Sequence, residues 1–147
     1  MNRYAELRSR HQKEFNELPL GFAFSNQQFN EMMNAWGLDP EKDLDKIYRI
    51  PGGGFVQKKD HAHLHEVTRR HKKEMQEAVS ADATGEGFIY DMFLYELRNH
   101  EFGYTGETEE TLEDLGYTAE EVEADKRLKK GLSMAIDRIV KREMAVW

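Results

Sequence analysis

The chain has 147 residues, a length typical of one domain, and it contains no cysteine, which excludes disulfide bonds and thiolate metal sites. Its formal net charge of −7 argues against general nucleic-acid binding, which needs a cationic surface. No segment reaches the roughly 18 apolar residues of a membrane span, and the first residues are charged, unlike a signal peptide. We therefore expect a cytoplasmic protein without a cofactor, folded as a single domain over residues 1–147.

The charge is spread unevenly along the chain. Residues 1–75 hold 13 Lys/Arg and 11 Asp/Glu, whereas residues 76–147 hold 8 and 17. From Asn99 to Asp125 there are ten carboxylates and no Lys or Arg. A segment of one sign favours a basic protein as its partner.

The first 40 residues predict two helices separated by a short extended piece. Apolar or large residues recur every three to four positions in the helix at 1–18, namely Tyr4, Leu7, His11, Phe15 and Leu18. An extended piece follows at 20–24. Ser25 and Gln28 then form a potential capping box for a second helix, which should bury Phe29, Met32, Met33 and Trp36 and end at Gly37.

The middle of the chain predicts a β-hairpin and a long helix. The hairpin at 46–58 has the glycine-rich tip Pro51-Gly52-Gly53-Gly54, which is followed by a strand rather than a helix, so a phosphate-binding loop is disfavoured. Asp60 can cap a helix over 61–79. The inner face of this helix should carry Leu64, Thr68, His71, Met75 and Ala78.

The most apolar stretch, GFIYDMFLYELRNHEFGYTG, begins at Gly87 and holds six of the sixteen aromatic residues. It predicts a helix over 87–102 that is apolar on nearly all sides. Such a helix is covered by neighbours in several directions. We therefore expect it to be the central helix of the fold.

The last segment, 107–144, predicts an acidic turn followed by helices. Thr105 or Thr108 can cap a short helix that ends at Gly116, and Thr118 with Glu121 forms another potential capping box. The last helix, 126–144, should face inward through Leu128, Leu132, Ala135, Ile136, Ile139 and Val140. The expected fold is mainly α (α+β), a helical domain around one central hydrophobic helix with one small β-hairpin.

Two pairs of residues have metal-ligand spacing. His61 and His65 are one helical turn apart, as are Glu96 and His100 on the central helix, so the four could complete one site if the helices face each other. This would make the protein a metal-dependent enzyme. The alternative is a solvated His-rich helix start, with Glu96 and His100 paired to each other and to nearby polar groups.

Other catalytic or binding motifs are incomplete. The loop 82–93 resembles the first eight positions of an EF-hand, but Phe93 stands where the closing Glu should be, which favours a plain helix-to-helix turn. No serine lies in a Gly-x-Ser-x-Gly context. Among the carboxylates, Glu96 is the candidate for a buried acid or base.

The acidic segment is the main candidate for a binding site, with no catalytic residue assigned. Its expected partner-binding residues are Tyr104, Glu107, Glu109, Glu110, Glu113, Asp114, Tyr117, Glu120, Glu121, Glu123 and Asp125. The two tyrosines would anchor a partner at the borders of a surface that imitates a nucleic-acid backbone. The alternatives are a solvated surface and a structural protein that self-associates through its first and last helices.

Two long stretches carry a resemblance to a known family. They are LPLGFAFSNQQFNEMMNAWGLDPEKDLDKIYRIPGGGFVQKKD and GEGFIYDMFLYELRNHEFGYTGETEETLEDLGYTAEEVEADKRLKKGL. The chain resembles, over roughly residues 18–135, an uncharacterised family of small acidic proteins from phages and mobile elements of gut Clostridia. That setting implies an accessory or anti-defence role, including inhibition of CRISPR nucleases. The expected partner is thus a basic host or phage protein, such as a nuclease complex.

Overall fold

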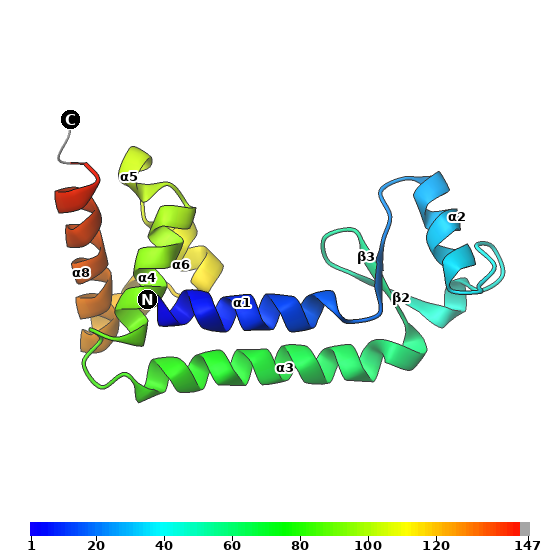
Figure 1. Cartoon of the computed structure of the whole chain (residues 1–147), viewed down its shortest axis with the longest axis horizontal. Helices are drawn as coiled ribbons and strands as arrows, with labels where there is room; N and C mark the ends of the chain where they lie inside the picture. Colours follow the sequence, from blue (N-terminus) through cyan, green and yellow to red (C-terminus); the bar gives the residue numbers. More distant parts are fainter. Residues whose placement is uncertain (145–147) are drawn as a thin grey trace. The chain divides into compact units, whose positions relative to one another are not determined.

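The computed structural model describes residues 1–144, whose contacts form two compact units (Figure 1). Unit 1 comprises Met1–His11 and Lys73–Trp147, and unit 2 comprises Gln12–Lys72. The first helix, α1 (Arg3–Asn16), and the third, α3 (Lys58–Ala81), each contribute residues to both units. Because each unit has its own hydrophobic cluster, the two are described separately.

Unit 1 is organised around α4 (Phe88–Asn99), which confirms the predicted central helix. Eight of its residues are buried, namely Phe88, Ile89, Asp91, Met92, Phe93, Leu94, Glu96 and Leu97. Such burial on several sides requires several neighbouring helices. These are α5 (Phe102–Thr105), α6 (Glu109–Leu115) and α8 (Lys126–Arg142), all in contact with α4.

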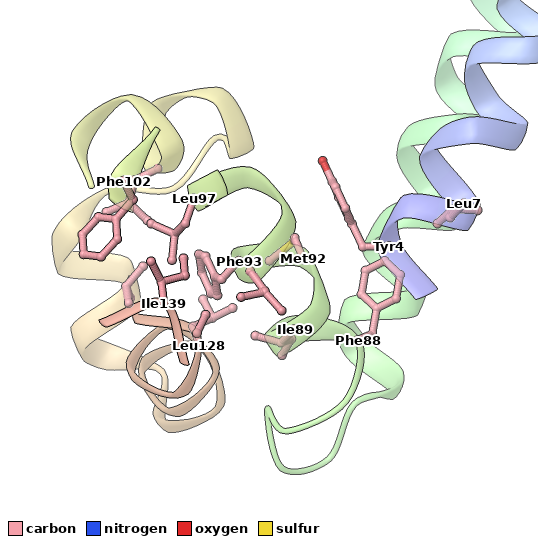
Figure 2. Close-up of a cluster of buried hydrophobic side chains, with 14 residues drawn as sticks. Tyr4, Leu7, Phe88, Ile89, Met92, Phe93, Leu97, Phe102, Leu128 and Ile139 are labelled. Atoms are coloured by element: carbon pink, nitrogen blue, oxygen red, sulfur yellow. The ribbon is translucent and has the colours of Figure 1, made fainter. Parts of the chain in front are cut away.

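Helix α4 packs most extensively against α8. Figure 2 shows Phe93 and Leu97 of α4 close to Leu128 and Ile139 of α8. Gly131 permits this approach, because a Cβ atom there would lie 2.5 Å from the Cγ2 atom of Ile89. The predicted inward face of α8 is confirmed for Leu128, Ala135 and Ile139, which are buried, while Leu132 and Ile136 are partly buried. It is wrong for Val140, which is 44% exposed, because the apolar stripe of α8 is wider than the area that α4 covers.

The central helix is shorter than the predicted 87–102. His100 is the C-cap of α4, and Glu101 adopts a left-handed conformation with φ of 58°. The chain then re-enters helical geometry as α5, which places Phe102 in the core cluster. The apolar pattern continues across this break because both segments face one core.

Unit 2 contains a three-stranded antiparallel sheet with the order β1-β3-β2. Strands β2 (Ile47–Ile50) and β3 (Gly54–Gln57) are the predicted hairpin. The extended piece after α1 is a third strand, β1 (Leu20–Phe22), in which Leu20 pairs with Val56. The expectation of a lone hairpin missed this strand, because its pairing partner is distant in sequence.

Helix α2 (Asn26–Ala35) forms half of its predicted capping box. The Ser25 hydroxyl accepts a hydrogen bond from the Gln28 amide at 3.1 Å, as expected. The Gln28 side chain, however, accepts from the amide of Phe24 at 2.8 Å. A short 3-10 helix, η1 (Leu44–Lys46), then leads into β2.

Helix α3 begins at Lys58, directly after β3, rather than at 61 after an Asp60 cap. Within unit 2 its buried residues are Leu64 and Val67, whereas Thr68 is exposed. The predicted inner face was thus wrong at Thr68, whose hydroxyl donates to the carbonyl of His65.

No helix within residues 1–144 is long and apolar enough to cross a bilayer.

Candidate functional site

The acidic segment folds as three short helices separated by left-handed glycines. Helix α5 ends at Gly106 and α6 at Gly116, with φ of 71° and 82°, and α7 (Ala119–Ala124) follows. Thr111, Leu112 and Val122 are buried on the inner side of these helices. The carboxylates therefore occupy the outer sides. Glu101, before α5, is exposed, and so are eight carboxylates that follow α5, which we call the acidic surface: Glu107, Glu109, Glu110, Glu113, Asp114, Glu120, Glu121 and Glu123.

Some of the predicted binding carboxylates serve the fold. The Glu121 side chain accepts from the Thr118 amide, which completes the predicted capping box. Asp125 is the N-cap of α8. Burial disfavours the charge of Asp125, but bonds from the Arg127 side chain and from two backbone amides lower its pKa. The Asp125 carboxylate thus accepts hydrogen bonds from its own chain, whereas Glu123 forms an ion pair with Lys129 at 2.9 Å on the surface.

Four other carboxylates of the acidic surface have no such role. Within residues 1–144, no Lys or Arg forms an ion pair with Glu107, Glu109, Glu113 or Glu120. Glu113 also lies in the last turn of α6, where the helix dipole disfavours negative charge. Glu109 and Glu120, by contrast, lie in the first turns of α6 and α7, where the helix dipole favours negative charge. All four side chains are nevertheless exposed and outside any ion pair of the described residues, so their charge is available to another molecule.

The two predicted tyrosine anchors differ in exposure. Tyr104 on α5 is 84% exposed. Tyr117 is half-buried, and its ring lies 6.3 Å from that of Phe93 in the core. Burial, together with the negative charge of Asp125, raises the pKa of the Tyr117 hydroxyl. We expected both tyrosines to be exposed, and this is confirmed for Tyr104 but wrong for Tyr117.

A second cluster forms where α4 meets α6. Glu96 is 2% exposed, and one carboxylate oxygen accepts from the Tyr4 hydroxyl at 2.7 Å while the other accepts from Asn99 Nδ2 at 3.2 Å. His100 lies one turn later and faces two carboxylates of α6. Its Nε2 atom is 3.4 Å from Asp114 Oδ2, and its Nδ1 atom is 3.6 Å from Glu110 Oε2.

This cluster contains a potential metal-binding set. Ligand atoms of Glu96, His100 and Asp114 all lie within 4.8 Å of one another. The sequence predicted Glu96 and His100 as ligands but assigned Asp114 only to the acidic surface. Sequence spacing could not reveal this proximity, because Asp114 approaches His100 through the packing of α6 against α4.

The charges around Glu96 influence their neighbours. Burial, followed by the hydrogen bond to Glu96, raises the pKa of the Tyr4 hydroxyl well above its usual range. Tyr4 therefore stays a proton donor to the carboxylate. Partial burial disfavours the charge of Arg8, but Glu96 together with Tyr95 and Tyr4 outweighs this and raises the Arg8 pKa.

The other predicted metal ligands lie in unit 2. His61 and His65 are exposed on α3, with ring centroids 6.4 Å apart, and the His61 ring lies 4.7 Å from that of Tyr48. Glu96 and His100 belong to unit 1. A joint site of all four residues therefore stays a prediction.

The EF-hand-like loop uses its first carboxylate internally. The two oxygens of Asp82 accept from the backbone amides of Thr84, Gly85, Gly87 and Ile89 at 2.9–3.2 Å. Burial disfavours the charge of Asp82, but these four amides lower its pKa. The carboxylate thus fixes the start of α4, which accords with the helix-to-helix turn that the sequence favours.

The chain belongs to a family of unknown function, DUF7659, whose model matches residues 3–138. This agrees with the predicted membership of an uncharacterised family. No curated protein and no solved structure matches the chain.

Proposed function

We propose that the protein is a non-enzymatic inhibitor that binds a basic, nucleic-acid-handling protein through the acidic surface of α5–α7. The observation that carries this proposal is the set of exposed carboxylates without an intramolecular cation, namely Glu107, Glu109, Glu113 and Glu120. They lie in a segment that contains no Lys or Arg between Asn99 and Asp125. Such a surface attracts a cationic channel over long range.

The arrangement of charges on α6 supports a role in binding over a role in folding. Glu109 and Glu113 are one helical turn apart, as are Glu110 and Asp114. Like charges at this spacing destabilise a helix by about 0.2–0.5 kcal/mol per pair. The self-repulsion would be relieved when a cationic partner covers the helix.

Tyr104 supplies an apolar anchor beside this charge. Its side chain is 84% exposed, although its neighbour Phe102 is buried in the core. Exposed aromatic residues contribute disproportionately to interfaces once a partner buries them. We therefore assign Tyr104 as the anchor, and the carboxylates as the groups that guide association.

The biological setting that we propose is anti-defence. A surface that resembles a nucleic-acid backbone would compete with nucleic acid for the channel of a nuclease, for example a CRISPR nuclease. Inhibition would be steric and electrostatic, with no covalent chemistry. It should therefore weaken with salt, since the Debye length falls from about 10 Å at 0.1 M to about 3 Å at 1 M.

The test compares two variants of equal net charge. One carries Glu107→Lys, Glu109→Lys, Glu113→Lys and Glu120→Lys, which leaves Glu110 and Asp114 intact. The control carries Glu31→Lys, Glu41→Lys, Asp45→Lys and Glu66→Lys, all exposed in unit 2. The immobilised wild-type chain would capture partners from a host lysate, and each would then be purified and assayed for binding and for competition with DNA.

We expect the first variant to lose at least about tenfold in affinity, because it reverses the attracting charge, and the control to bind like the wild type. The bound partner should release DNA when the wild-type chain is added. Equal binding by both variants, or binding that leaves DNA in place, would refute the proposal. Circular dichroism of both variants checks that the fold is retained.

A further inference from the structure

The cluster between α4 and α6 has a ligand chemistry that the proposed acidic surface does not need. We propose that Glu96, His100 and Asp114 bind a divalent first-row transition ion. The ligand set combines one imidazole nitrogen with two carboxylate oxygens, which suits ions such as Zn²⁺. The atoms concerned already lie within 4.8 Å of one another.

The burial of Glu96 is the first argument for a cation. Its side chain is 2% exposed, yet its hydrogen-bond donors, Tyr4 and Asn99, are both neutral groups. Within residues 1–144, no Lys or Arg pairs directly with this carboxylate. Arg8 acts on this carboxylate only through longer-range attraction, so a metal ion would supply a positive charge in direct contact with it, which lowers the cost of its burial.

The distances around His100 are the second argument. Its Nε2 atom lies 3.4 Å from Asp114 Oδ2, which is longer than a usual hydrogen bond. Two ligands that are each about 2.1 Å from one tetrahedral ion are about 3.4 Å apart. The spacing of this long hydrogen bond is therefore also the spacing that a shared cation requires.

The other ring nitrogen of His100 provides the third argument. Its Nδ1 atom lies 3.6 Å from Glu110 Oε2, which is beyond hydrogen-bond distance, but the Glu110 side chain is 82% exposed and can rotate closer. A histidine that binds a metal through one nitrogen commonly donates its other N–H group to a carboxylate, which orients the ring. Glu110 would thus be a positioning residue. The Tyr4 hydroxyl and Asn99 amide would hold Glu96 in the same way.

The site can adjust to an ion without rearranging the core. The side chains of His100 and Asp114 are 21% and 52% exposed, so small rotations can bring their ligand atoms closer to buried Glu96. The proposal does not depend on partner binding by the acidic surface. A bound ion would, however, tie α6 to α4 and neutralise part of that surface.

Isothermal titration calorimetry of the full chain with Zn²⁺ tests the proposal, together with the melting temperature with and without the ion. We expect the wild type to bind one ion and to gain several degrees, because the ion binds only the folded site. His100→Ala and Asp114→Asn should abolish both effects. Both positions are partly exposed, so these variants should fold.

Two further variants distinguish this site from Zn²⁺ binding by the histidines at the start of α3. Glu110→Gln should weaken Zn²⁺ binding by roughly 10–100-fold, as is usual for groups that position a ligand. The variant His61→Ala, His63→Ala and His65→Ala should bind like the wild type. Absence of Zn²⁺ binding, or its loss only in that triple variant, would overturn the proposal. Spectra with Co²⁺ in place of Zn²⁺ would give an independent signature of the ligand geometry.

Discussion

Units 1 and 2 differ in the size of their cores and in their charge. Within residues 1–144, the hydrophobic cluster of unit 1 has fourteen buried residues, whereas that of unit 2 has four. Unit 1 carries 12 Lys/Arg and 19 Asp/Glu, whereas unit 2 carries nine of each. The excess of negative charge thus lies on the unit whose larger core is better able to withstand its self-repulsion.

The two units also expose different kinds of surface. Apart from Tyr104, unit 1 presents mainly charged side chains on α5–α7. Unit 2 leaves large apolar residues half-exposed or more, including Phe24 at 75% and Leu44 at 54%. These two residues and Phe29 line a pocket that also contains Arg49. A small core together with exposed apolar surface predicts lower local stability for unit 2, because hydrophobic burial is the dominant stabilising term.

The largest expected loss of stability comes from the same substitution, Leu→Ala, made in the core of each unit. Leu97→Ala in unit 1 removes a fully buried side chain and should cost about 4–5 kcal/mol, whereas Leu64→Ala in unit 2 should cost about 2–3 kcal/mol, because Leu64 has fewer neighbours to leave around a cavity. Urea denaturation followed by circular dichroism measures both. Equal costs, or a larger cost for Leu64→Ala, would show that the units are packed equally well.

A smaller loss of stability is expected when two glycines of similar conformation are replaced by alanine, one closely packed and one in open space. Gly85 in unit 1 and Gly52 in unit 2 have φ of 89° and 82°. A Cβ atom at Gly85 would lie 2.1 Å from the carbonyl oxygen of Arg127, whereas one at Gly52 would meet nothing within 4 Å. Gly85→Ala should therefore cost about 3 kcal/mol, and Gly52→Ala about 1 kcal/mol from left-handed strain alone.

The same urea experiment measures the two glycine variants. Their difference isolates the contact with the Arg127 backbone, because the backbone strain is common to both. A difference below about 0.5 kcal/mol, the usual error of additivity, would mean that the loop before α4 shifts freely.

The smallest effect concerns the acid sensitivity of unit 2. Hydrogen bonds from Arg70 and then His71 lower the pKa of Glu14 to about 2. Since the pKa is lower in the folded state, this carboxylate stabilises unit 2 fully above its unfolded pKa of about 4.3, and the contribution is lost as the pH falls through about 2. Glu14→Gln should reduce stability at neutral pH and flatten the decline below about pH 4.

Thermal unfolding between neutral pH and pH 2 measures that decline, and NMR titration of the Glu14 carboxyl gives its midpoint directly. Glu17→Gln is a suitable control, because it removes the same charge outside the ion pair. A Glu14 midpoint near 4 in the folded protein would show that Arg70 and His71 do not hold this carboxylate.

The sequence by itself determined the features that depend on neighbouring residues. The central helix follows from the most apolar stretch of the sequence, and the capping box of Thr118 and Glu121 follows from residues three positions apart. The hairpin follows from two strands joined by a glycine-rich tip. The acidic surface follows likewise from an uninterrupted run of one charge, although the burial of Tyr117 does not.

Only the tertiary structure decided which distant residues meet. Strand β1 joins the sheet by pairing with Val56, and Tyr4 donates to Glu96 across 92 positions of sequence. Asp114 reaches His100 because α6 packs on α4 through its buried side. Hydrophobic burial is non-directional, so a periodic pattern shows that a face is covered but not which element covers it. The proposed metal ligands, unlike the acidic surface, therefore come together only in the folded chain.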